Sequence, residues 1–204
     1  MKERYFEMNQ YDPEAVNLRK RIYDWCKKRE TVVQTVCGFV LEFADIIIDH
    51  AMNDNDTNNG GWPATSMRTF VNNDIYNLLP SEIKNAIIDT TVVSGHGNTS
   101  GETNFTSTDK LYLLAPKEIY TDFNDTVDTA KDLTRTLDYY TSIAVTTSNY
   151  SGAIKKNGTN ASYWWLRTAG SGSTSGFLYV GFTGDWSSNF ASYSYGVAPA
   201  FRID

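Results

Sequence analysis

The apolar positions of the first fifty residues predict a helix followed by strands. Asp12-Pro13 supplies a capping carboxylate and a proline at the first helical position, and a rough apolar stripe then runs to about Lys28. Residues 31–48 are instead rich in β-branched and aromatic side chains, which favours strands. We expect residues 1–30 to be a helical extension and residues 31–204 to form one domain.

The middle of the chain predicts two consecutive helices between loops. Residues 66–79 carry apolar side chains at helical spacing, and Pro80 ends that helix. Residues 81–88 predict a second, short helix. The flanking segments 53–61 and 92–108 are polar or rich in glycine, which is typical of loops.

The second half of the chain predicts strands. Apolar runs near residues 110–115, 163–168, 176–182 and 197–203 fit four strands, while residues 122–158 form a long excursion with little periodicity. Strands, two helices and then strands again, joined by long irregular loops, indicate an α+β fold.

Composition narrows the classes of function. The chain has 204 residues, 41% of them hydrophobic and 14% aromatic, so it is globular. A net charge of -6 argues against a nucleic-acid partner, and no apolar run is long enough for membrane insertion. The N-terminus has no signal-peptide h-region. Cys26 and Cys37 are too few for a disulfide-stapled module, so the fold must depend on its core.

Motifs for metal binding or catalysis are incomplete. Asp54, Asp56 and Asn58 alternate as in a calcium-binding EF-hand, but Asn59 and Thr65 stand where that loop needs Gly and Glu. His50 and His96 are too few for a histidine metal site. His96 with Asp109 is conceivable as an acid–base pair, yet no nucleophile motif accompanies it. We therefore expect no enzyme activity, no catalytic residue, no metal and no cofactor.

The last forty residues have the composition of a recognition surface. Between Arg167 and Arg202 the only charged residue is Asp185, and large aromatics alternate with Ser, Gly and Asn. Tyrosine supplies amphipathic contact area at low entropic cost, and small polar residues supply adaptable hydrogen bonds. This stretch therefore points toward binding.

Several short motifs follow one another in order from Met52 to Ile203. They are Met52-Asn53, Asn59-Gly60-Gly61-Trp62, Ser66-Met67-Arg68, Ile75-Tyr76-Asn77, Leu79-Pro80, Val93-Ser94-Gly95-His96-Gly97, Thr108-Asp109-Lys110-Leu111-Tyr112-Leu113-Leu114, Trp164-Trp165-Leu166-Arg167 and Gly196-Val197-Ala198-Pro199-Ala200-Phe201-Arg202-Ile203. With these motifs, residues 39–204 resemble C-type-lectin-fold domains of gut bacteria and their phages, related to the formylglycine-generating-enzyme subclass. Many such domains are variable proteins of diversity-generating retroelements. The resemblance implies two helices plus small antiparallel sheets with long irregular loops.

The resemblance also implies a hypervariable C-terminal region, about residues 164–203. Such retroelements copy a template RNA with errors at adenines, which scatters Asn codons over many residue types but never yields Lys, Glu, Gln, Met or Trp. After Lys156 the chain contains no Lys, Glu, Gln or Met, and Trp186 stands where the family keeps a fixed Trp. An ordinary loop of biased composition is the alternative. The candidate variable, ligand-binding positions are Ser171, Ser173, Thr174, Phe177, Tyr179, Phe182, Asp185, Ser187, Ser188, Asn189, Phe190, Ser192, Tyr193 and Tyr195.

The resemblance gives other residues structural roles. Trp62, Met67, Trp164, Trp165 and Phe201 are expected in the core. Gly60-Gly61 permits the turn before the first helix, and Arg68 and Arg167 are expected to hold loops through hydrogen bonds. The sugar-and-calcium motifs of animal C-type lectins and the catalytic cysteines of formylglycine-generating enzymes are absent, so neither activity is implied.

The function implied is ligand binding without catalysis. The partner is an unknown protein or glycan, met through receptor recognition on a virion tail or bacterial cell surface. The alternative is a fixed structural or adhesin module of a phage tail or bacterial surface protein. The oligomeric state stays open, because the N-terminal helix could self-associate or pack on its own domain.

A geometric expectation accompanies this function. In a strand at 176–182, Phe177 and Tyr179 share one face, and Leu178 and Val180 share the other. Leu178 and Val180 suit the interior, so Phe177 and Tyr179 are expected to point outward. The loop near residues 187–190 must then fold back so that the candidate positions converge on one exposed face.

Overall fold

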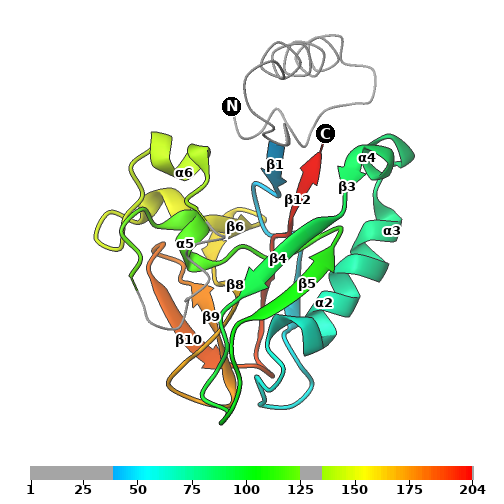
Figure 1. Cartoon of the computed structure of the whole chain (residues 1–204). Coiled ribbons are helices and arrows are strands. Elements are labelled where there is room, and N and C mark those ends of the chain that lie inside the picture. The colour runs from blue at the N-terminus through cyan, green and yellow to red at the C-terminus, as the bar shows by residue number, and fades with distance from the viewer. Residues whose placement is uncertain (1–38, 125–134, 204) are drawn as a thin grey trace, which may run out of the picture.

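The computed structural model describes residues 39–124 and 135–203 (Figure 1). The predicted N-terminal helical extension, together with Cys26 and Cys37, lies outside the described residues. Within them the chain is α+β, with short helices and several small sheets. No helix in this part of the chain is long and apolar enough to cross a membrane.

The largest sheet has five strands in the order β10-β9-β8-β11-β2. Its strands are β2 (Ile48–Ala51), β8 (Trp164–Ala169), β9 (Gly176–Val180), β10 (Trp186–Phe190) and β11 (Ser194–Val197). All neighbours are antiparallel except β8 and β11, which pair in parallel. The loop predicted near residues 187–190 is therefore wrong: this segment is strand β10, whose polar side chains hide it from a hydrophobic pattern.

A second sheet joins the two ends of the described chain. Its order is β1-β12-β3, with β1 (Phe39–Glu42), β12 (Ala200–Ile203) and β3 (Ile87–Ile88). The strand predicted at 197–203 is thus two strands in two different sheets. Its interruption falls at Ala198-Pro199, because proline has no N–H to donate to a strand ladder. Figure 1 shows β1 and β12 side by side.

The segment predicted as a loop at residues 92–108 is largely a hairpin. Strand β4 (Thr90–Ser94) pairs antiparallel with β5 (Phe105–Asp109). Strand β5 has the sequence Phe-Thr-Ser-Thr-Asp, and the side chains it buries are Ser107 and Asp109 rather than apolar ones. Hydrophobic alternation cannot reveal such a strand.

The first predicted helix is confirmed. Helices α2 (Ser66–Phe70) and α3 (Tyr76–Leu78) are joined by a π-helical turn, Val71–Ile75, into one continuous helix. The Thr65 side chain caps it by accepting from the backbone N–H of Arg68. The second helix, α4 (Ser81–Ala86), ends two residues before its predicted end, because Ile87 and Ile88 form strand β3.

The strand predicted at residues 110–115 is wrong, although its apolar side chains are buried. Only Tyr112 makes a β-bridge, to Ala200. Other backbone groups bond to side chains: Asn72 accepts from the N–H groups of Lys110 and Leu111. The segment is therefore an irregular part of the core in which side chains supply some of the hydrogen bonds to the backbone.

The remaining elements are short helices, single turns and one further hairpin. They are the single turn Trp62–Ala64, α5 (Pro116–Ile119), α6 (Asp138–Ser142), the turn Ser151–Ala153, and the hairpin of β6 (Lys155–Asn157) and β7 (Asn160–Ser162). The predicted core residues Trp62, Met67, Trp164, Trp165 and Phe201 are all buried.

Candidate ligand-binding surface

Six aromatic side chains form a continuous cluster on the five-stranded sheet. We call them the aromatic surface: Tyr163, Tyr179, Phe182, Phe190, Tyr193 and Tyr195. Tyr163 lies at its centre, with ring centroids 5.5 Å from Tyr179, 5.5 Å from Phe182 and 5.0 Å from Tyr195. Tyr193 extends the cluster, at 6.3 Å from Tyr195 and 5.9 Å from Phe190. Five of the six are candidate variable positions, and Tyr163 is the addition.

Sheet register explains the centre of the cluster. Trp165 on β8 pairs with Tyr179 on β9, and paired residues in an antiparallel ladder share a face. Tyr195 on the neighbouring strand β11 lies 4.7 Å from Trp165 and 5.1 Å from Tyr179, between ring centroids. Trp165 itself is fully buried, and its indole N–H donates to the carbonyl of His50 at 3.0 Å. Tyr179 and Tyr195 therefore pack on a tryptophan whose position is fixed by burial and by this hydrogen bond.

The outer rings are open to solvent. Phe182, Phe190 and Tyr193 expose 51%, 47% and 48% of their surface, while Tyr163, Tyr179 and Tyr195 are half-buried. Exposed aromatics grouped in this way, above a buried layer, are typical of interaction sites.

Neutral hydrogen-bonding groups accompany the rings. Ser187 on β10 is exposed and pairs with Tyr179, and the Asn189 side chain donates to the Tyr195 hydroxyl oxygen at 2.6 Å. Ser188, also exposed, pairs with Leu178 and so lies on the other face of the strand. Partial burial raises the pKa of Tyr195 above its ordinary value, an effect that the bond from Asn189 opposes. The one acidic candidate, Asp185, accepts from Thr183 and lies in the turn between β9 and β10. The surface is thus essentially uncharged at neutral pH.

Phe177 departs from the predicted geometry. It is fully buried, whereas an exposed ring was expected. It pairs with Ala169 and Asn189 at the end of the sheet where β8 is irregular between Trp165 and Ala169. Leu178, whose side chain lies on the opposite face, is buried as well, so both faces of the sheet are covered at this end. Phe177 is a core residue, and its alternation with Leu178 did not reveal this since the strand is covered on both sides.

The remaining candidates border this closed end. Ser171, Ser173 and Thr174 lie in the loop between β8 and β9, and Ser192 follows β10. Thr174 and Ser192 are exposed, whereas Ser171 and Ser173 are half-buried. The loop meets the end of β10 through a hydrogen bond from Ala191 N–H to the Ser175 carbonyl at 2.9 Å. These positions adjoin the aromatic surface without joining its ring contacts.

Asn58 supports that loop from beneath. It is fully buried, and its side-chain amide donates to the carbonyls of Ser173 at 3.0 Å and Gly176 at 2.8 Å. Its backbone N–H donates to the Thr174 carbonyl at 2.9 Å. Gly97 packs against the Asn58 amide so closely that a Cβ there would overlap it. Sequence reasoning missed Asn58 as a support, since nothing distinguishes it from the other Asn residues of its segment.

The EF-hand-like segment does not gather its side chains at one point. Asn58 faces the loop above, while Asp56 accepts from the Ser192 N–H at 3.1 Å. Asn53 bonds to the Thr57 carbonyl at 2.7 Å and accepts from Ser66 N–H at 3.0 Å. In residues 39–124 and 135–203, no group of three His, Cys, Asp or Glu is placed to hold a metal ion.

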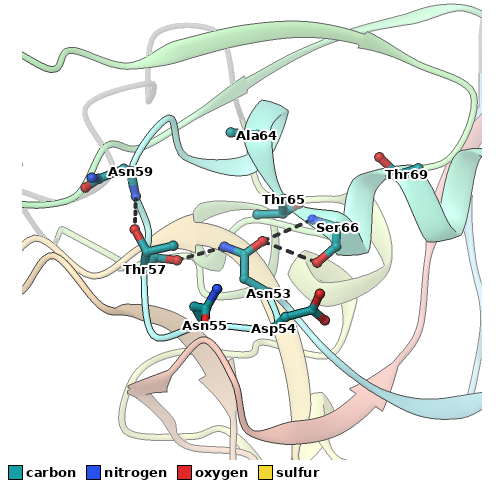
Figure 2. Close-up of a pocket in the computed structure, with 9 residues that line it drawn as sticks. All are labelled: Asn53, Asp54, Asn55, Thr57, Asn59, Ala64, Thr65, Ser66 and Thr69. Carbon is teal, nitrogen blue, oxygen red and sulfur yellow. Dashed lines mark hydrogen bonds between the residues drawn. The ribbon is translucent and has the colours of Figure 1, made fainter.

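A polar hollow of about 330 Å³ opens beside this segment (Figure 2). Asn, Asp, Thr and Ser side chains line it, together with one alanine: Asn53, Asp54, Asn55, Thr57, Asn59, Ala64, Thr65, Ser66 and Thr69. Figure 2 shows Asn53 bridging the segment to the start of α2. Several of its polar groups already bond to one another, so the hollow is a solvated recess beside the site.

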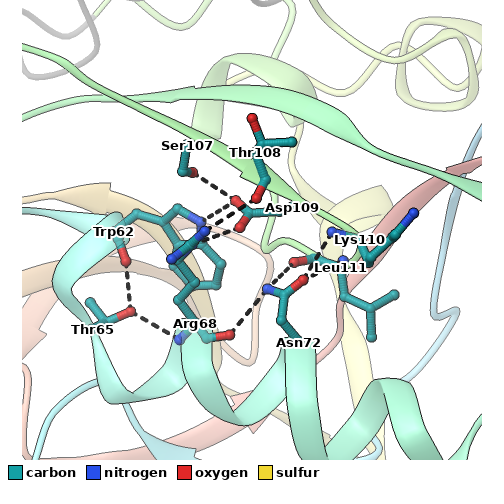
Figure 3. Close-up of polar contacts among 9 residues, drawn as sticks. All are labelled: Trp62, Thr65, Arg68, Asn72, Ser107, Thr108, Asp109, Lys110 and Leu111. Atoms are coloured by element: carbon teal, nitrogen blue, oxygen red, sulfur yellow. Dashed lines mark hydrogen bonds and ion pairs between the residues drawn. The ribbon is translucent and has the colours of Figure 1, made fainter.

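Two buried carboxylates fix the scaffold. Asp109 accepts from the Trp62 indole at 3.0 Å, Ser107 at 2.7 Å and Arg68 at 2.6 Å (Figure 3). The acid–base pair imagined for His96 and Asp109 is not formed, since this carboxylate is fully engaged and His96 contacts the Gly97 carbonyl.

The second carboxylate, Glu118, forms an ion pair with Arg167 on β8. Arg167 also donates to the carbonyls of Val93 at 3.1 Å and Leu113 at 2.9 Å. Arg68 and Arg167 therefore hold backbone segments and carboxylates together, which confirms the roles expected of them.

Comparison with known proteins assigns the domain. A family model described as "Domain of unknown function (DUF6273)" matches residues 38–204. The chain belongs to the DUF6273 family. No curated protein and no solved structure matches it. The DUF6273 domain thus comprises every described element, from β1 to β12, and the aromatic surface lies wholly within it.

Proposed function

We propose that this DUF6273 chain is a non-enzymatic ligand-binding protein that recognises its partner through the aromatic surface. The observation that carries the proposal is the continuous ring cluster, half-exposed, on a floor made by Trp165. Isolated exposed aromatics need no explanation, but six in mutual contact expose apolar area that a partner would cover.

The chemistry of the surface favours an uncharged partner face. Tyrosine rings offer flat apolar area with one hydroxyl each, and Ser187 and Asn189 add neutral donors and acceptors. A protein or a glycan fits this chemistry. A polyanion such as nucleic acid does not, because no cationic side chain belongs to the cluster.

The division of the C-terminal region supports diversification by a retroelement. Fully buried Trp164, Arg167 and Val197 flank it, while most candidate positions between them are exposed or half-buried. Exposed positions tolerate exchange at little cost in stability, and buried ones do not. Phe177 is the exception, and a variable core position would restrict which variants fold.

We further propose the C-type lectin fold for the domain and a place on a virion tail or bacterial surface. Pairing of β1 with β12 brings the ends of the domain together and leaves long irregular loops between them, as that fold requires. A fixed structural or adhesin module remains the alternative function.

Sequencing the neighbourhood of the gene tests the proposal. We expect a reverse transcriptase gene and a near-identical template repeat whose differences from the gene fall at adenines. The differing codons should be those of the candidate positions. A neighbourhood without such a repeat, or differences spread over buried residues such as Trp164 and Val197, would favour the fixed module.

A further inference from the structure

An apolar groove lies on the described domain away from the aromatic surface. It measures about 260 Å³ and is lined by Phe43, Ile47, Ile48, Ile75, Leu78 and Leu79. Leu78 exposes 81% of its surface, Ile48 44% and Ile47 40%. Three large aliphatic side chains exposed around one hollow mark a surface that a partner covers.

The groove and Tyr193 of the aromatic surface lie at opposite ends of one strand pair. Ile48 pairs with Val197 at one end of the β2–β11 ladder, and Ala51 pairs with Ser194 at the other. Tyr193 directly precedes Ser194. An occupant of the groove would therefore lie at the end of this strand pair away from Tyr193.

The chain itself contains a segment that suits the groove. Leu18, Ile22 and Trp25 follow the spacing i, i+4, i+7, which places three apolar side chains on one face of a helix. Such triplets are the anchors with which helices bind grooves. A helix over residues 15–28 would be about 21 Å long at 1.5 Å per residue.

Charge complementarity favours the same segment. Residues 15–29 contain six Lys or Arg and one Asp. Acidic side chains stand beside the groove lining in sequence and are exposed: Asp45, Asp49, Asp74 and Glu82. A basic helix near these carboxylates would gain favourable electrostatics in addition to apolar burial.

The connection is long enough. Residues 29–38 separate this segment from β1, and ten extended residues reach about 33 Å. Phe43, which lines the groove, directly follows β1. The segment therefore has its attachment point close to the groove, and tethering raises its effective concentration there.

We propose that residues 15–28 dock as an amphipathic helix into the apolar groove of the same molecule. Docking would cover Ile47, Ile48 and Leu78 and fix the N-terminal segment beside strand β2. The inference does not depend on what the aromatic surface binds.

Hydrogen–deuterium exchange on the full chain tests this docking. We expect backbone amides of residues 15–28 to exchange at least about tenfold faster in Leu78→Glu than in the unaltered chain. Trp25→Glu should have the same effect on residues 15–28 and should also speed exchange in residues 74–79. Ile143→Glu, at a similarly exposed isoleucine outside the groove, is the matched control and should change neither.

Three outcomes would overturn the proposal. One is fast exchange of residues 15–28 in the unaltered chain. Another is protection that Leu78→Glu and Trp25→Glu leave unchanged. The third is protection that increases with protein concentration together with a dimeric mass by light scattering, which would place a second copy in the groove. Trp25→Glu keeps the test decisive if Leu78→Glu fails to fold, since Trp25 lies outside the described core.

Discussion

The side-chain amide of Asn189 donates a 2.6 Å hydrogen bond to the hydroxyl oxygen of Tyr195, although their strands are not neighbours. Strands β9 and β8 lie between β10 and β11, so the bond crosses the sheet face between two candidate variable positions. Exchange at one position therefore changes the hydrogen-bonding partner of the other. The arrangement of side chains on this surface therefore depends on combinations of residues rather than on each residue alone.

The hydrogen bond from Asn189 should affect the pKa of Tyr195. Burial raises the pKa of Tyr195, and the donor from Asn189 opposes that rise by stabilising the phenolate. Asn189→Ala should raise the pKa of Tyr195 further. Titration of the tyrosine ring signals by NMR, with Tyr195→Phe to assign the signal, measures it. Ser187→Ala is the control, and an unchanged or lowered pKa would mean that the bond is absent in solution.

Replacement of exposed and of buried positions in the candidate variable region should differ widely in its cost in stability. Simultaneous replacement of Ser187, Ser188 and Tyr193 by Ala should change the free energy of unfolding by about 0.5 kcal/mol or less per site, because all three are exposed. Phe177→Ala should cost about 3–5 kcal/mol, as for a buried phenylalanine in general, and Phe201→Ala should resemble it.

Urea unfolding monitored by circular dichroism compares these variants. Equal losses from the exposed and buried sets would show that the exposed residues pack as core. In that case the aromatic surface would not be free to bind.

Asn58→Ala should loosen the loop between β8 and β9. The change removes one donor each from the carbonyls of Ser173 and Gly176, which keep the backbone donors Asn98 and Gly170, so it costs about 0.5–1.5 kcal/mol for each hydrogen bond lost. We expect a lower melting temperature and faster amide exchange in residues 170–176. Asn55→Ala, an exposed asparagine of the same segment, is the matched control. Similar behaviour of the two variants would contradict the supporting role of Asn58.

Alkaline pH should destabilise the fold through its buried tyrosines. Burial raises the pKa values of Tyr112, Tyr120 and Tyr140 well above the ordinary value near 10.0. The unfolded chain therefore loses these protons first, so stability is full below about pH 10 and falls as pH rises toward the folded-state pKa values.

The slope of this loss can be measured. Each such tyrosine contributes up to about 1.4 kcal/mol per pH unit above pH 10. Urea unfolding between pH 8 and 11, with Tyr140→Phe for comparison, should show a steep decline that the variant reduces. A free energy of unfolding that stays constant to pH 11 would be the contrary result.

Sequence patterns predicted the elements whose buried side chains are apolar. The helix containing Met67, Val71 and Ile75 was predicted because its buried stripe has helical spacing. Trp164 and Phe201 were placed in the core by the family resemblance, and both are buried, as large apolar side chains within strands favour the interior.

Elements whose buried side is polar were not predicted. Strand β5 buries Ser107 and Asp109, which satisfy each other and Trp62 through hydrogen bonds that depend on the tertiary fold. Asn58 becomes a support only when residues distant in sequence present their carbonyls to it. Phe177 is buried because other parts of the chain cover both faces of the sheet at this end. An alternating sequence pattern predicts which residues share a face but not whether both faces are covered.

The pairing of β1 with β12 has a consequence for the gene as well as for the fold. Strand β12 is encoded after every candidate variable codon, and both β1 and β3 depend on it as their only partner within the three-stranded sheet. A frameshift or stop codon introduced between codons 171 and 195 would delete β12 and with it the shared strand of that sheet. Such truncated or frameshifted products would lack this shared strand, so under the diversification proposed above only copies with an intact reading frame would keep the three-stranded sheet.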